Sequence, residues 1–142
     1  MLRGRLMTAK QDFARLMLGM FATSFPAFPL TFAYAAQAEA PQGKADVLDV
    51  KGPPNFTARF FIDATTHLPI MLTWTPPAPP KPGAPPPAEQ RLYFADYREV
   101  DGLRLPFRIR RAAGAETTEE TTFDRFRINA RIDPRRFDTS GQ

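Results

Sequence analysis

The sequence has no cysteine, one histidine and two serines, and these shortages exclude several kinds of chemistry. Without cysteine there is no disulfide, no thiol nucleophile and no cysteine-bound zinc, although the cellular compartment stays undecided. Ser24 and Ser140 lie near opposite ends of the chain, which makes a serine triad with His67 implausible. A hydrolase built on His67 alone is the weakest hypothesis, because a catalytic histidine needs partners. We therefore predict a protein that is not an enzyme.

Metal and nucleotide sites are also poorly supported by the residues present. No glycine-rich loop leads from a strand into a helix, so a nucleotide-phosphate motif is missing. The glutamates in the stretch 116–120 are most simply the solvent-exposed face of a strand, and no histidine accompanies them as a metal ligand; they are Glu116, Glu119 and Glu120. Asp46 and Asp49 have opposite parity in a strand and should point to different faces. We expect no metal and no cofactor.

The net charge of +4 and the pI of about 9.8 suit an anionic partner only if the basic residues cluster. They do not, because Arg108, Arg110 and Arg111 are followed closely by glutamates, and Arg125 and Arg127 follow Asp124. Interleaved signs are typical of a solvated sheet face with cross-strand ion pairs. Nucleic-acid binding is therefore not expected.

Residues 1–29, taken together with the residues up to 40, have two interpretations. A basic start, an apolar stretch and the small residues of "AQAEA" outline a secretory signal. Against it, Asp12 lies in the basic part, and Pro26 and Pro29 interrupt the apolar part. The favoured alternative is an amphipathic helix over residues 8–21 that the prolines terminate. Its apolar face would consist of Phe13, Leu16, Met17 and Met20.

Residues 30–138 form the predicted β domain, followed by a tail at 139–142. The apolar period changes to two, and short turns separate the apolar runs, which indicates antiparallel hairpins. Residues 76–88 interrupt the pattern with prolines, which remove ladder donors, so we expect an exposed connection or, alternatively, a ligand for a proline-binding domain. The expected strands span 30–38, 45–51, 56–63, 68–74, 91–100, 103–111 and 117–129.

The sequence contains 13 phenylalanines, and strand parity places many apolar side chains on one face of the sheet. We predict a mainly β (α+β) fold: a curved antiparallel sheet, or unclosed half-barrel, with an N-terminal helix and a proline-rich hairpin loop. Such a face packs on a helix, a partner or an apolar ligand. The candidate ligand-binding residues are Phe32, Tyr34, Phe56, Phe60, Leu72, Trp74, Phe94, Phe107, Ile109 and Phe126.

Two segments, "DATTHLP" (63–69) and "DGLRLPFRI" (101–109), have a similar pattern. Each predicts a hairpin with an aspartate near the turn and a proline near the start of the second strand. Together with "FRINARIDPRRF" (126–137), their order resembles the outer-membrane lipoprotein carrier (LolA-like) superfamily and related bacterial envelope proteins. The positions that carry the resemblance are Ile62, Asp63, Thr66 to Pro69, Ile128, Asn129, Ile132, Asp133 and Phe137.

The resemblance implies an unclosed β-barrel that is plugged by helices and holds a lipid or lipoprotein acyl chain in the periplasm or cell envelope. Peripheral membrane contact and an envelope protein partner are compatible with it. The resemblance also extends to a regulator domain of the same fold. This domain implies the alternative function, in which the chain is a structural or regulatory interaction module without a lipid ligand. The chain departs from the family in having one helix and fewer strands, as if shortened or truncated at its start. Arg59 is the position that could correspond to the carriers' lid-holding arginine.

Overall fold

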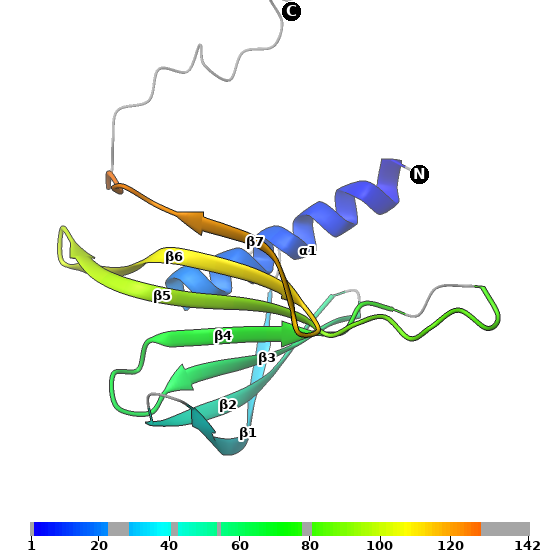
Figure 1. Ribbon diagram of the computed structural model, residues 1–142, viewed down its shortest axis with the longest axis horizontal. Coiled ribbons are helices and arrows are strands. Elements are labelled where there is room, and N and C mark those ends of the chain that lie inside the picture. Colours follow the sequence, from blue (N-terminus) through cyan, green and yellow to red (C-terminus); the bar gives the residue numbers. More distant parts are fainter. Residues whose placement is uncertain (1, 23–28, 41–42, 54, 78–80, 129–142) are drawn as a thin grey trace, which may run out of the picture.

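The structure, a computed structural model, describes residues 2–22, 29–40, 43–53, 55–77 and 81–128. Within these residues one helix precedes seven strands (Figure 1). The elements are α1 (Leu2–Phe21), β1 (Thr31–Ala40), β2 (Gly43–Gly52), β3 (Phe56–Asp63), β4 (Pro69–Trp74), β5 (Gln90–Val100), β6 (Leu103–Ala113) and β7 (Glu116–Thr122).

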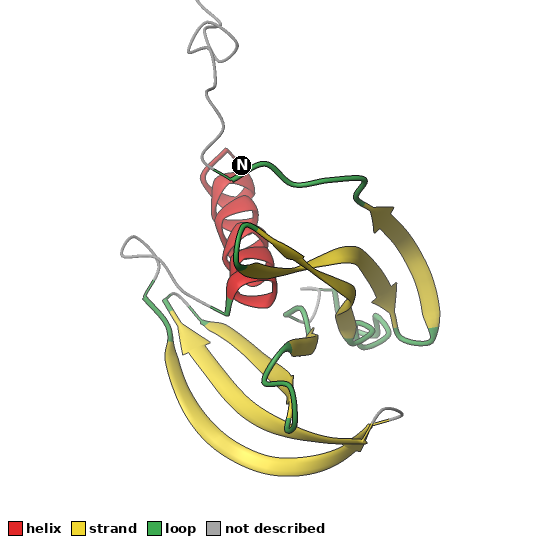
Figure 2. Cartoon of the chain, turned by 90° about the vertical axis from the view of Figure 1, so that its left-hand side faces the viewer, coloured by secondary structure: helices red, strands yellow, loops and turns green. Residues whose placement is uncertain are grey.

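The strands form a single antiparallel sheet in the order β1-β2-β3-β4-β5-β6-β7, so each strand pairs with its neighbours in the sequence. The sheet curves strongly, and α1 lies across its concave side (Figure 2). Strands β1 and β7 are its two edges, so the sheet does not close. The predicted fold class, an unclosed antiparallel sheet with one N-terminal helix, is confirmed.

Turn chemistry explains this simple connectivity. Between β5 and β6, Asp101 and Gly102 both have positive φ, at 49° and 83°, as a tight two-residue hairpin turn requires. The proline-rich segment joins β4 to β5 and projects from one end of the sheet (Figure 1). Its described residues, 75–77 and 81–89, form no strand and are mostly exposed, as the sequence predicts.

Helix α1 begins earlier than expected, and its buried face differs from the predicted one. The prediction that Phe13 faces the sheet is wrong, because its exposed fraction is 52%. Ala14 and Leu18 are buried instead, and Leu16 and Met20 lie at the margin of the core. The reason is close packing: small residues bring the helix backbone against the sheet, where a large ring would hold it away.

The last strand is shorter than predicted, because β7 ends at Thr122 and not at residue 129. Phe123 and Phe126 lie beyond it, and the Phe126 ring contacts both Phe123 and Phe107, with centroid distances of 4.8 and 5.0 Å. Side chains three apart in a strand point to opposite faces, so this clustering requires the chain to leave the extended conformation. The expected cap at Asp133, the packing of Phe137 and the tail lie outside the described residues.

The interleaved charges pair across strands, as predicted. Arg111 Nε of β6 lies 3.7 Å from Oε2 of its direct cross-strand partner Glu119 on β7, and Arg108 Nε lies 3.9 Å from Oε1 of Glu120, its diagonal neighbour. Each exposed pair stabilises the fold by at most about 1 kcal/mol. The core provides most of the stability, and it is formed by α1 and the concave face of the sheet.

Candidate functional site

The concave face of the sheet carries a continuous row of apolar side chains. Tyr34, Leu48, Phe60, Leu72 and Leu92 are consecutive cross-strand partners from β1 to β5. The side chain at one end is open, since Tyr34 is 65% exposed, whereas Leu72 and Leu92 are fully buried. The row therefore runs from solvent at the β1 edge into the core beneath α1.

Most of the predicted ligand-binding residues lie on this face, but they differ in how far their side chains are exposed to solvent. Phe32 and Tyr34 are exposed on β1, Trp74 is half-buried beside α1, and Phe126 lies after the last strand. The others have exposed fractions of 7% or less; they are Phe56, Phe60, Leu72, Phe94, Phe107 and Ile109. All of this group except Phe107 belongs to the core cluster that includes Ala14 and Leu18 of α1, so a ligand could touch these residues only after α1 moved away.

Arg15 of α1 is a residue that the sequence analysis did not identify. It is buried, with 9% exposure, and its guanidinium lies between two rings, 5.1 Å from the centroid of Phe56 and 4.3 Å from that of Trp74. Its Nη1 donates to Asp12 Oδ1 at 3.1 Å. Loss of solvation lowers the pKa of Arg15, although the carboxylate of Asp12 opposes this shift.

The two similar hairpins meet through one tyrosine. The hydroxyl of Tyr97 on β5 donates to the carbonyl oxygen of Pro69 at 2.7 Å, and Tyr97 pairs with Pro106 of β6. Burial raises the pKa of Tyr97, so the hydroxyl keeps its proton and remains a donor. Tyr97 thus connects the second hairpin to the first at Pro69, next to its own partner Pro106.

The first of these turns is organised by Asp63. Its Oδ1 accepts hydrogen bonds from the backbone N–H groups of Thr65 and Thr66, both at 2.8 Å. These two bonds lower the pKa of Asp63. His67 follows with a φ of 61°, and its exposed position fits a turn residue better than a catalytic one.

Two cavities flank this junction. One, of about 450 Å³, lies between the β3–β4 turn and β5 and is lined by residues that include Asp63, Ile70 and Asp96. The other, of about 160 Å³, lies at the end of α1, where His67 meets Met20, Leu105 and their neighbours. Among the described residues that line the second cavity, Arg104 is charged and none is a carboxylate.

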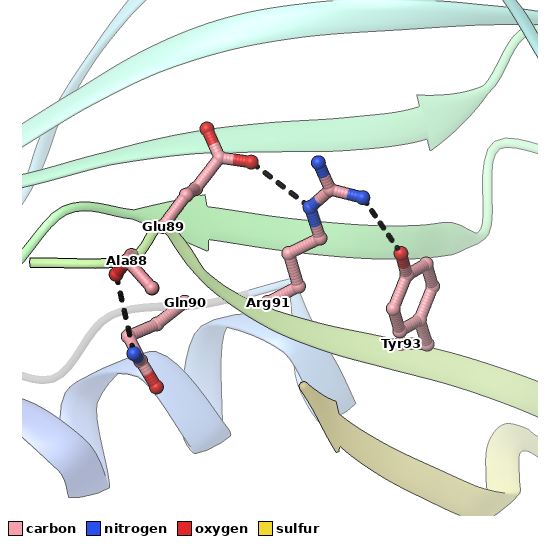
Figure 3. A network of polar contacts seen from close by, with 5 residues as sticks. All are labelled: Ala88, Glu89, Gln90, Arg91 and Tyr93. Atoms are coloured by element: carbon pink, nitrogen blue, oxygen red, sulfur yellow. Dashed lines mark hydrogen bonds and ion pairs between the residues drawn. The ribbon is translucent and has the colours of Figure 1, made fainter. Parts of the chain in front are cut away.

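A cavity of about 750 Å³ lies beside the middle of α1, where the proline-rich segment leaves the sheet. Arg15, Arg111 and Gln90 contribute to its lining. Figure 3 shows Gln90 directed toward α1, whereas Arg91 and Tyr93 point to the other side of β5. There Arg91 bonds Glu89 Oε1 at 2.9 Å and the Tyr93 hydroxyl at 3.2 Å.

Comparison with protein-family models, with curated proteins and with solved structures found no match for this chain. Within the described part of the chain, no three histidine, aspartate or glutamate side chains are grouped as metal ligands would be. The described helix is not apolar enough over its length to cross a membrane. The resemblance to lipoprotein carriers therefore stays a prediction. The concave face of the sheet and α1, which covers part of it, are the features that bear on function.

Proposed function

We propose that the protein binds the acyl chain of a lipid or lipoprotein along the concave face of its sheet, in the periplasm or elsewhere in the cell envelope. The observation that carries the proposal is the apolar row from Tyr34 to Leu92, which is open at the β1 edge and buried under α1. An acyl chain is a long apolar ligand, and it matches such a row better than a compact molecule does.

The apolar path is wider than a single row at its open end. On β1, Phe32 pairs with Val50, which in turn pairs with Ala58 on β3. Val50 and Ala58 are buried, whereas Phe32 is 47% exposed. Two exposed aromatic side chains therefore stand next to the core on the same face, where an acyl chain can cover them without any rearrangement of the sheet.

Binding further along the face requires α1 to move, because the helix packs on β4, β5 and β6. Burying a methylene contributes about 0.8 kcal/mol, so a chain of about ten methylenes contributes about 8 kcal/mol. Exposing the buried side chain of Leu18 would cost about 1.5–3 kcal/mol. An acyl chain can thus replace much of the apolar contact that the helix provides, and it would leave when the helix returns.

The proposal predicts that Phe32→Ser and Tyr34→Ser weaken the binding of a fatty acid by about tenfold each, since each removes an aromatic contact at the open end. Both positions are exposed, so the free energy of unfolding should change by no more than about 0.5 kcal/mol. Leu103→Ser, at the first position of β6 and as exposed as Phe32, is the matched control. Isothermal titration of the three variants with decanoate measures the effect; equal affinities in all three would contradict the proposal.

A second candidate function is a structural or regulatory module without a lipid ligand. It is favoured by β1, an edge strand that carries Phe32 and Tyr34 in exposed positions, since a partner strand could add to such an edge. In that case the apolar face meets another protein and the proline-rich segment assists docking. A tight, lipid-free dimer in multi-angle light scattering, dissociated by Tyr34→Ser, would favour this module.

A further inference from the structure

The guanidinium of Arg15 is held in an apolar position with few polar partners. The rings of Phe56 and Trp74 lie on it, and Asp12 accepts a hydrogen bond from its Nη1. Its Nε is buried and has no hydrogen-bond partner. A guanidinium has five N–H donors and stays charged at physiological pH, so this group has unused capacity to bind an anion.

A second guanidinium faces the same cavity. Arg111 of β6 is cross-strand partner to Leu92, which places it on the concave side, and it lines the cavity of about 750 Å³ together with Arg15. The charge of Arg111 disfavours the charged form of Arg15, as expected for neighbouring cations. Its Nε is 3.7 Å from Glu119 Oε2, and that pair is solvent-exposed on the glutamate side. Two forked donors therefore converge on one space.

The remaining lining of this cavity is suited to a polar group. Side chains of Gln11, Asn55, Thr57 and Gln90 come from α1, the β2–β3 turn, β3 and β5. A carboxylate or phosphate accepts several hydrogen bonds at once, and arginine binds both groups with two parallel bonds. The cavity thus combines two guanidinium groups, neutral polar side chains and enough volume for a head group; Asp12, which is bonded to Arg15, is the one carboxylate among the described residues of its lining.

The cavity is also connected to the apolar face. Phe56 contacts Arg15 and belongs to the same core cluster as Val50 and Ala58. Ala58 pairs with Val50, and Val50 pairs with the exposed Phe32. A ligand with its acidic group at Arg15 would therefore lie next to the apolar path that leads from Phe56 to the β1 edge, of which Phe56, Val50 and Ala58 are buried in this structure and Phe32 is exposed.

We propose that Arg15 and Arg111 bind a carboxylate or phosphate group, carried as the acidic head group of the acyl ligand. This inference rests on the proposed function, because it names the head group that accompanies the chain. The competing explanation is purely structural, with Arg15 fixing α1 to the rings of Phe56 and Trp74. The structural role predicts a loss of stability on replacing Arg15 but no preference for an acidic ligand.

The experiment compares decanoate, decanol and inorganic phosphate by isothermal titration of the full chain. Trp74 is the only tryptophan, and its ring contacts Arg15, so its fluorescence gives a local signal for each ligand. We expect decanoate to bind about tenfold or more tightly than decanol, as for a charge-assisted hydrogen bond gained, with a change in Trp74 emission. Arg111→Gln should remove this preference while leaving decanol binding unchanged.

Arg15→Gln should also remove the preference for decanoate, provided that thermal melting shows this variant to be folded. If it does not fold, Arg111→Gln still tests the inference, since Arg111 is less buried than Arg15. The matched control is Arg98→Gln. Arg98 also lies over a ring, that of Phe107 at 4.7 Å, and pairs with Asp96 at 2.8 Å, but it does not line this cavity. It should keep the preference for decanoate.

The three ligands separate the failure of the inference from that of the proposed function. Equal binding of decanoate and decanol, or a preference that survives Arg111→Gln, would overturn the acidic-head-group site while the acyl-binding proposal stands. Phosphate binding that Arg111→Gln abolishes, without binding of either chain, would assign the site to a free anion and overturn both the head-group source and the acyl proposal. No binding of any of the three would overturn both proposals.

Discussion

At the scale of single residues, one hydroxyl group connects the two similar hairpins. Tyr97 donates to the Pro69 carbonyl at 2.7 Å from a mostly buried position. Tyr97→Phe should therefore lower the free energy of unfolding by about 1 kcal/mol, as for a typical buried hydrogen bond lost. Urea denaturation measures the change. Tyr93→Phe is the matched control, since its hydroxyl accepts from Arg91 on the other face, and a loss as large as that for Tyr97→Phe would contradict the special role of Tyr97.

Asp63 makes the stability of the first hairpin depend on pH. Its folded-state pKa lies below the value of an unfolded aspartate, roughly 3.9, because backbone N–H groups stabilise the carboxylate. The stabilising contribution is therefore complete above the unfolded pKa and is lost as the pH falls through the lower folded pKa.

Asp63→Ala should accordingly destabilise the fold at neutral pH by an amount that shrinks on acidification, and Asp63→Asn, which keeps an acceptor oxygen, should do so less. Urea denaturation at a series of pH values tests this pattern. A difference between wild type and Asp63→Ala that stays constant, or grows, as the pH falls below the unfolded pKa would rule out the carboxylate as its source.

At the scale of elements, the contact between α1 and β5 decides how the helix covers the sheet. An added Cβ at Gly19 would lie 1.8 Å from Cζ of Phe94, far inside van der Waals contact. In an exposed helix, replacing glycine by alanine stabilises by about 1 kcal/mol. Here Gly19→Ala should instead destabilise, by about 1–3 kcal/mol, because the ring must move.

Thermal or urea denaturation of Gly19→Ala measures the sign of this effect. Phe94→Leu combined with Gly19→Ala is the informative control, since a smaller side chain under the helix should relieve most of the clash, so that the two changes are strongly coupled. If Gly19→Ala were stabilising, the close contact between helix and sheet would be wrong.

The same contact shows what the sequence could and could not predict about the elements. Period-two alternation placed Phe56, Ala58 and Phe60 on the inner face, and their burial confirms it. Hydrophobicity correctly placed Leu16 and Met20 against the core, but it wrongly included Phe13, which is exposed, and missed Ala14, which is buried. Helix orientation depends on the ring beneath Gly19, which lies on a distant strand, and local periodicity does not contain that information.

At the scale of the whole molecule, most of the strand order follows from the short turns, because short connections leave antiparallel neighbours as the simplest arrangement; β4 and β5 are also neighbours although the longer segment 75–89 joins them. The buried position of Arg15 was not predictable in this way. A charged residue on a helix normally indicates its solvent side, and only the assembled rings of Phe56 and Trp74 provide a site for the guanidinium. The apolar face was predicted from parity, whereas its cover and its open end at β1 required the structure.

The central claim is that the concave face holds an acyl chain, and native mass spectrometry of the purified chain tests it most directly. The proposal predicts an additional bound mass that organic extraction identifies as an acyl lipid, and that decreases in the Tyr34→Ser variant. An empty monomer that also takes up no added fatty acid would contradict the claim, and the aromatic residues would then serve as core or as the contact surface of a protein partner.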